Sequence, residues 1–167
     1  MIKLILAAVV GSSCLACGII KSSEYKTRVN ELTYFRDMLL ALSREITYRK
    51  DPVALTLCRI KNQTMGHTLD FIAAVTSADI IELKQGWEHA ADKVYGEILS
   101  DDDIAVVKEA GAELGRNGML QQQAMIEMII TKLNIQIAEA EDTYKTKGKM
   151  CRAIGGFCGA AIVILLI

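Results

Sequence analysis

The sequence is poor in the residues and motifs that carry enzymatic chemistry. Among 167 residues there are two histidines, five cysteines and one tryptophan. There is no P-loop, no glycine-rich dinucleotide-binding motif, no HExxH and no paired CxxC set in the polar part of the chain. His67 and His89 are expected on a loop or a helix surface. We therefore predict a protein that is not an enzyme and that binds neither a cofactor nor a metal ion.

The charge distribution argues against nucleic acid as a partner, and the cysteine content indicates the cellular compartment. Nineteen basic and twenty acidic residues are mixed along the chain, so no basic field exists that would hold nucleic acid. Four cysteines lie in or beside the apolar ends: Cys14, Cys17, Cys151 and Cys158. Cys58 alone lies in the middle, and a lone thiol cannot build a disulfide framework, so we expect a reducing compartment. A membrane-bound thiol enzyme working through Cys58 is one alternative.

Both ends of the chain are hydrophobic, whereas the middle carries almost all of the charge. Residues 4–20 and 153–167 contain no charged side chain. The first run spans roughly 25 Å as a helix, slightly less than the ~30 Å core of a membrane, and Lys3 and Lys21 can reach the interface beyond it. The predicted organisation is a transmembrane helix, a helical bundle and a second transmembrane helix, at residues 1–21, 22–149 and 150–167.

Basic residues beside the two segments set the expected orientation, because they are retained on the cytoplasmic side of a membrane. They are Lys21, Lys26 and Arg28 after the first segment and Lys145, Lys147, Lys149 and Arg152 before the second. Only Lys3 lies on the other side, so we expect the middle in the cytoplasm. A signal peptide cleaved near Ala16 and Gly18, or lipid attachment within residues 14–17, stays open. Either would give a signal-cleaved or lipid-modified extracytoplasmic helical binding protein.

Small residues recur in both apolar segments. Gly155 and Gly159 form a GxxxG pattern, which lets helix backbones approach closely in lipid, and Gly11 and Gly18 are candidates for the same role in the first segment. Pairing of the two segments, or of either with a partner's helix, is the hypothesis. The alternative is that glycine and alanine are simply common in membrane helices.

The middle of the chain has the periodicity of helices. Apolar residues recur every three or four positions from Tyr25 to Ile46, and Glu31 is assigned to the polar face of that helix. Asp51-Pro52 predicts a corner before the next helix. Further helices are predicted at 53–62, 69–75, 79–94, 101–114 and 120–144. No alternating strand pattern is present, so the fold class is all-α, an antiparallel bundle of about six helices between the two membrane helices.

Local signals mark the boundaries of these helices. Gly66 breaks the chain, and Asp79 with Glu82 has the spacing of a capping box. The carboxylates of Asp101–Asp103 follow Ser100 and oppose the positive end of a helix, so we prefer capping to metal binding there. Residues 116–118 are predicted to form a turn. The helix of residues 120–144 is expected to continue through Lys149, with a loosening at Gly148.

The stretch from Glu45 to Val53, EITYRKDPV, resembles the E-I-x-Y-x-x-x-P-L pattern of the stage III sporulation protein AB family of endospore-forming bacteria. Leu114-Gly115, seven residues before Gln122, resembles that family's L-G turn, and residues 138–141 before a basic linker and apolar tail resemble its ending. Gly118 stands where the family usually has an acidic residue. The similarity covers the entire chain.

The resemblance implies a small helical bundle similar to the soluble domain of type II secretion system F proteins and type IV pilus platform proteins. It implies a non-enzymatic part of the membrane complex that joins mother cell and forespore, located in the mother-cell plasma membrane around the forespore. Its expected partners are the membrane, a cytoplasmic secretion-type ATPase and other proteins of the same complex, and self-association stays open. The candidate contact residues are Glu45, Tyr48, Pro52 and Gln122. Tyr48 and Pro52 are expected first of all to fix a helix corner.

Overall fold

The computed structural model describes residues 2–49, 53–77, 83–114 and 119–166, and throughout these ranges the regular structure is helical, with no strand. The chain divides into two compact units. One comprises residues 30–138, and the other joins residues 1–29 to residues 139–167. The first unit, called the bundle here, is shorter at each end than the predicted bundle of residues 22–149. The second is called the terminal helix pair.

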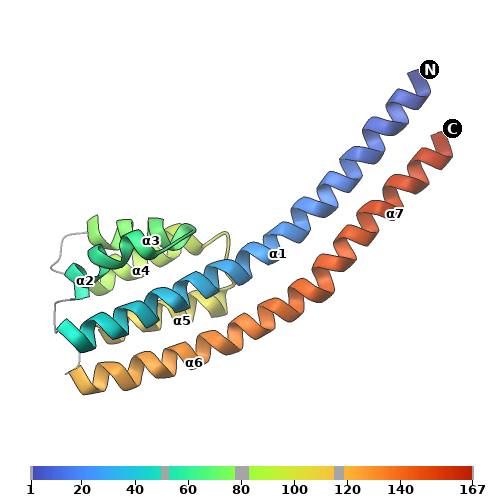
Figure 1. The fold of residues 1–167 in the computed structure, drawn as a ribbon. Coiled ribbons are helices and arrows are strands. Elements are labelled where there is room, and N and C mark those ends of the chain that lie inside the picture. The colour runs from blue at the N-terminus through green and yellow to red at the C-terminus, as the bar shows by residue number, and fades with distance from the viewer. Residues whose placement is uncertain (1, 50–52, 78–82, 115–118, 167) are drawn as a thin grey trace. The chain divides into compact units, whose positions relative to one another are not determined.

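Six α-helices contribute to the described part of the bundle (Figure 1). They are the second half of α1 (Ile2–Arg49), α2 (Val53–Ile60), α3 (His67–Ser77), α4 (Leu83–Tyr95), α5 (Asp101–Leu114) and α6 (Met119–Thr143). A 3-10 helix, η1 (Lys61–Gln63), extends α2. The predicted all-helical fold with about six helices is thus confirmed for the described residues. Three sequence predictions lie outside the described residues and stay predictions: a corner at residues 51–52, a cap at residues 79–82 and a turn at residues 116–118.

Four aromatic rings form the centre of the bundle. Phe35, Phe71, Trp87 and Tyr95 are each fully buried, and the ring centroids of five pairs among them lie 4.9 to 6.2 Å apart. Most of these pairs meet edge to face, the arrangement that aromatic quadrupoles prefer. The indole nitrogen of Trp87 donates a hydrogen bond to the Val107 carbonyl at 2.7 Å. The ring cluster therefore joins α1, α3 and α4, and the Trp87 hydrogen bond connects it to α5.

The predicted apolar stripes pack around this cluster. The stripe of α1 is buried from Leu32 to Ile46, and Ile104, Val107 and Leu114 are buried on α5. Burial of such side chains stabilises a fold by about 1.5–3 kcal/mol each, so these stripes account for how the helices associate.

Two predicted helix boundaries are confirmed by their hydrogen bonds and backbone angles. The Ser100 backbone N–H donates to the Asp103 carboxylate at 3.0 Å, and the Asp103 N–H donates to the Ser100 hydroxyl at 3.3 Å. This reciprocal pair is the capping box of α5, and it gives Asp103 a structural role. Gly66 has a φ of 66°, which side chains disfavour, and it separates η1 from α3.

The assignment of Glu31 to a polar outer face is wrong, because Glu31 is only 3% exposed. Its carboxylate accepts hydrogen bonds from the start of α3. A side chain at Gly66 would overlap Glu31 and Tyr34, so a residue without a Cβ allows the chain to approach the carboxylate closely. The carboxylate oxygens are thereby hydrogen-bonded, which offsets the cost of burying this charged group.

The terminal helix pair consists of the first part of α1 and the helix α7 (Lys149–Leu166), which run antiparallel (Figure 1). α6 passes into α7 without a break through η3, a π-helical turn at Tyr144–Gly148. The predicted loosening at Gly148 is therefore confirmed, and it takes the form of a π-bulge. In the parts of the helices that the structure describes, no stretch is both long and apolar enough to count as a membrane span.

Candidate functional site

Glycine backbones form the contact between the two terminal helices. A Cβ added at Gly18 would lie 2.8 Å from the Cys151 carbonyl oxygen and 3.3 Å from the Gly155 Cα. A Cβ at Gly159 would lie 3.0 Å from the Gly11 oxygen. The structure therefore brings together all four glycines singled out from the sequence, at Gly11, Gly18, Gly155 and Gly159. We call this contact the glycine seam.

The outer surface of the same helices is apolar. Phe157 and Ile164 are 78% and 77% exposed, whereas the seam glycines are buried. Other large exposed apolar residues of this unit are Val9, Leu15, Ile19, Ile20, Met150 and Ile154. The pair thus places its smallest residues inside and its largest apolar residues outside, the reverse of a helix pair that folds in water.

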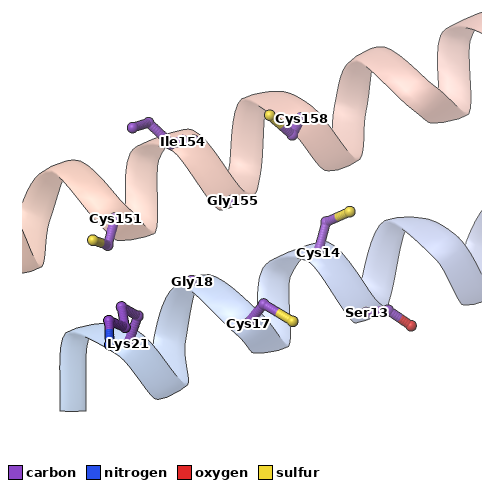
Figure 2. A pocket seen from close by; sticks show the side chains of 9 residues that line it. All are labelled: Ser13, Cys14, Cys17, Gly18, Lys21, Cys151, Ile154, Gly155 and Cys158. Carbon is purple, nitrogen blue, oxygen red and sulfur yellow. The ribbon is translucent and has the colours of Figure 1, made fainter. Parts of the chain in front are cut away.

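One face of the pair is hollowed, and Figure 2 shows the residues that line the hollow. Its volume is about 400 Å³, and its lining is Ser13, Cys14, Cys17, Gly18, Lys21, Cys151, Ile154, Gly155 and Cys158. All four thiols are free. Among the described residues no group of three or more His, Cys, Asp or Glu side chains could hold a metal ion. The hollow is therefore an apolar surface feature with one cation, Lys21, at one end (Figure 2).

The cysteines at positions 14, 17, 151 and 158 were expected in the apolar ends, but their sharing of one surface was not predicted. The spacing could have revealed it, since residues three and seven positions apart lie on one face of a helix. Cys14 and Cys17 are three apart, and Cys151 and Cys158 are seven apart.

Basic side chains follow the first apolar run and precede the second along the chain. Lys26, Lys147 and Lys149 are exposed. Lys21 is paired with Glu24 at 2.5 Å, and Lys145 with Glu141 at 3.0 Å. Arg152 lies over the Tyr144 ring, with 6.0 Å between its Cζ and the ring centroid, and its Nε donates to the Gly148 carbonyl at 3.3 Å. That hydrogen bond satisfies a carbonyl of the π-helical turn.

The candidate partner-contact residues of the bundle differ in their contacts and exposure. Glu45 forms an ion pair with Arg59 at 3.4 Å, which joins α1 to α2, whereas Tyr48 is 86% exposed. Gln123 donates to the Thr47 hydroxyl, so the end of α1 meets the start of α6. Gln122 lies on α6 with its side chain outside the described part, and Pro52 is also outside it. The structure therefore brings Glu45 and Tyr48 to the bundle end where α6 begins.

The residues considered for enzymatic chemistry are carried by three different helices. His67, His89 and the Cys58 thiol are all exposed, on α3, α4 and α2. His67 Nδ1 lies 3.9 Å from an Asp70 oxygen, at the start of α3.

Comparisons with known proteins agree with the motifs noted in the sequence. The model of the stage III sporulation protein AB family matches residues 3–167. The stage III sporulation protein AB of Bacillus subtilis (strain 168) is 25% identical over 170 residues, which cover 99% of each chain. A solved structure of stage III sporulation protein AB has a similar fold, with a TM-score of 0.64 and 24% identity over 71% of this chain and 97% of the other.

The family model thus covers both apolar ends as well as the bundle. The resemblance inferred from the EITYRKDPV stretch is thereby confirmed: the chain belongs to the stage III sporulation protein AB family and is a sporulation protein.

Proposed function

We propose that the chain is a non-enzymatic membrane platform of a sporulation complex. Its terminal helix pair lies in the plasma membrane of the mother cell around the forespore, and its bundle lies in the cytoplasm, where it docks a secretion-type ATPase and other proteins of the complex. The membrane anchoring and the docking are two parts of this proposal, and different residues support them.

The glycine seam is the main observation in support of membrane anchoring. In water, a helix pair is held together by burial of large apolar side chains, but here the buried contact is made by backbone at Gly18 and Gly155. Phe157 and Ile164 point outward instead. Lipid is the solvent in which this arrangement is favourable, because packing of small residues drives helix association there and exposed apolar side chains carry no penalty.

Basic residues support the cytoplasmic location of the bundle. Between the apolar ends and the bundle, residues 21–28 and 145–152 hold seven basic side chains and one acidic one. Such an excess beside a membrane segment is retained on the cytoplasmic side. Both ends of the chain then lie on the other side of the membrane.

Cys58 provides a natural test of this topology, since its thiol is exposed on the bundle. In a variant with the four terminal cysteines replaced by alanine, a membrane-impermeant maleimide should leave Cys58 unlabelled in intact cells and label it after permeabilisation. Cys58→Ser in the same background identifies the labelled site. Labelling in intact cells would refute the cytoplasmic location. A mature mass below that of the full chain, or a lipid adduct, would favour the extracytoplasmic alternative.

Tyr48 supports the docking part, because a tyrosine that is 86% exposed at a helix end contributes little to the fold and is a common anchor of protein interfaces. Glu45 forms an ion pair with Arg59 and contributes charge to the same end of the bundle.

Tyr48→Ala should lower capture of the ATPase by the full chain in mild detergent, with helix content unchanged. Ile135→Ala removes an exposed apolar residue of α6 and is the matched control. Equal capture by the two variants would count against docking at Tyr48.

A further inference from the structure

We propose that the hollow of the terminal helix pair binds an anionic phospholipid, with an acyl chain in the hollow and the phosphate at the Lys21 end. The inference rests on the proposed membrane anchoring and adds to it a specific lipid partner. It joins two observations, the shape of the apolar lining and the charge beside it.

The lining is suited to an acyl chain. The absence of side chains at Gly18 and Gly155 lowers the floor of the hollow to the helix backbone, and the thiols of Cys14, Cys17 and Cys158 form apolar walls (Figure 2). A volume of about 400 Å³ lies in the range of small-molecule pockets. In a bilayer the nearest molecules able to fill such an open apolar hollow are the surrounding lipids.

The basic residues of the terminal helix pair favour an anionic phospholipid headgroup. Lys21 is the one charged residue of the lining, and its side chain is 59% exposed although it is paired with Glu24. Lys147 and Lys149 are exposed in the same unit, and residues 145–152 contain no acidic side chain. Basic residues at the edge of an apolar membrane segment attract anionic headgroups, whereas a zwitterionic headgroup gains little from them. Phosphatidylglycerol therefore fits this site better than phosphatidylcholine.

The experiment is native mass spectrometry of the full chain in mild detergent, titrated with phosphatidylglycerol or phosphatidylcholine. We expect one phosphatidylglycerol to bind per chain, about tenfold more tightly than phosphatidylcholine. Lys21→Gln should weaken phosphatidylglycerol binding about fivefold. Lys93→Gln, the same change on the exposed surface of α4, should have no effect. Equal binding of the two lipids, or equal effects of the two substitutions, would overturn the proposal.

Filling the hollow tests the acyl-chain part. Cys158→Phe places a ring in the hollow, whereas Ile19→Phe adds the same ring at an exposed position outside its lining. Only Cys158→Phe should reduce lipid binding. Glycerol phosphate offers a related headgroup without acyl chains and should not compete with phosphatidylglycerol. Competition would assign the cations to a soluble phosphoester and refute the lipid site.

Alkaline carbonate extraction of native membranes separates the membrane-anchoring proposal from the lipid-site proposal. Release of the chain would refute the anchoring, and retention without a phosphatidylglycerol preference would refute the lipid site alone.

Discussion

Glu31 of α1 accepts a hydrogen bond from the backbone N–H of His67, the first residue of α3, at 3.1 Å. The first N–H groups of a helix have no partner within it, and a side chain from the preceding residues usually supplies one. Here the acceptor comes from another helix. Thr68 donates to the same carboxylate at 3.5 Å and accepts from the Tyr95 hydroxyl at 2.8 Å. This buried network fixes α3 between α1 and α4.

Glu31→Ala should lower the free energy of unfolding by about 2 kcal/mol, because it removes the acceptor and leaves buried donors unpaired. Glu31→Gln keeps an acceptor oxygen and should cost less. The measurement is urea unfolding of the full chain in mild detergent, followed by circular dichroism. Glu97→Ala removes the same side chain at an exposed position and is the control. A loss no larger than that of the control would contradict the capping role.

We expect the stability of the bundle to fall at alkaline pH because of Tyr95. Burial raises the pKa of its hydroxyl well above the ordinary value, and the hydrogen bond with Thr68 offsets only part of that effect. The folded protein therefore holds the Tyr95 proton more tightly than the unfolded chain does. The contribution of Tyr95 to stability is complete below about pH 10, where the tyrosine of the unfolded chain is also neutral. That contribution is lost as the pH rises above about 10.

Tyr95→Phe should therefore flatten the alkaline loss of stability while costing about 1 kcal/mol at pH 8, where only the hydrogen bond is missing. Unfolding free energies between pH 8 and 11 measure both effects. Tyr48→Phe, at a residue 86% exposed, should leave the pH dependence as in the parent chain. The same alkaline slope in Tyr95→Phe and the parent would show that another group causes it.

The sequence was sufficient for the helices because their signals are local. The apolar period between Leu32 and Ile46, the capping box at Ser100 and the break at Gly66 each depend on a few neighbouring residues. The loosening at Gly148 was predictable for the same reason, since a glycine within a long helical pattern weakens it locally.

Features that depend on contacts between distant residues were not predictable in this way. Glu31 is charged, so the sequence favours a surface position for it, and only the approach of the chain at Gly66 explains its burial. The glycine pattern of α7 indicated helix contact but not which helix. That Gly155 meets Gly18 depends on the fold of the whole chain between them.

Gly111 leaves the space that the Trp87 indole occupies, since an added Cβ would overlap the ring. Gly111→Ala should therefore displace Trp87, weaken its hydrogen bond to Val107 and destabilise the bundle by about 1–3 kcal/mol through overpacking. Trp87 is the only tryptophan of the chain, so a shift of its fluorescence maximum reports the displacement directly. Ala105→Leu enlarges an exposed residue of α5 and should leave the emission unchanged. An unaltered emission in Gly111→Ala would mean that the ring does not pack on this glycine.

Adjacent glycines of α7 give the sharpest test of the glycine seam. A Cβ at Gly155 would lie 2.9 Å from the Cys14 carbonyl oxygen, whereas one at Gly156 would meet only the end of the Leu15 side chain at 3.9 Å. Gly155→Leu should therefore separate the helices and Gly156→Leu should not. In a chain that keeps only Cys14 and Cys158, a membrane-permeant bis-maleimide should link the two ends, which line the same hollow.

After proteolysis within the bundle, linked ends migrate as one fragment and unlinked ends as two. We expect Gly155→Leu to abolish most of the linked product and Gly156→Leu to preserve it. Equal linking in both variants would show that the ends are held together without backbone contact, because a leucine side chain cannot fit where the helices touch. Loss of linking in both would place Gly156 in the contact as well and would contradict the geometry, in which Gly156 lies beside the seam.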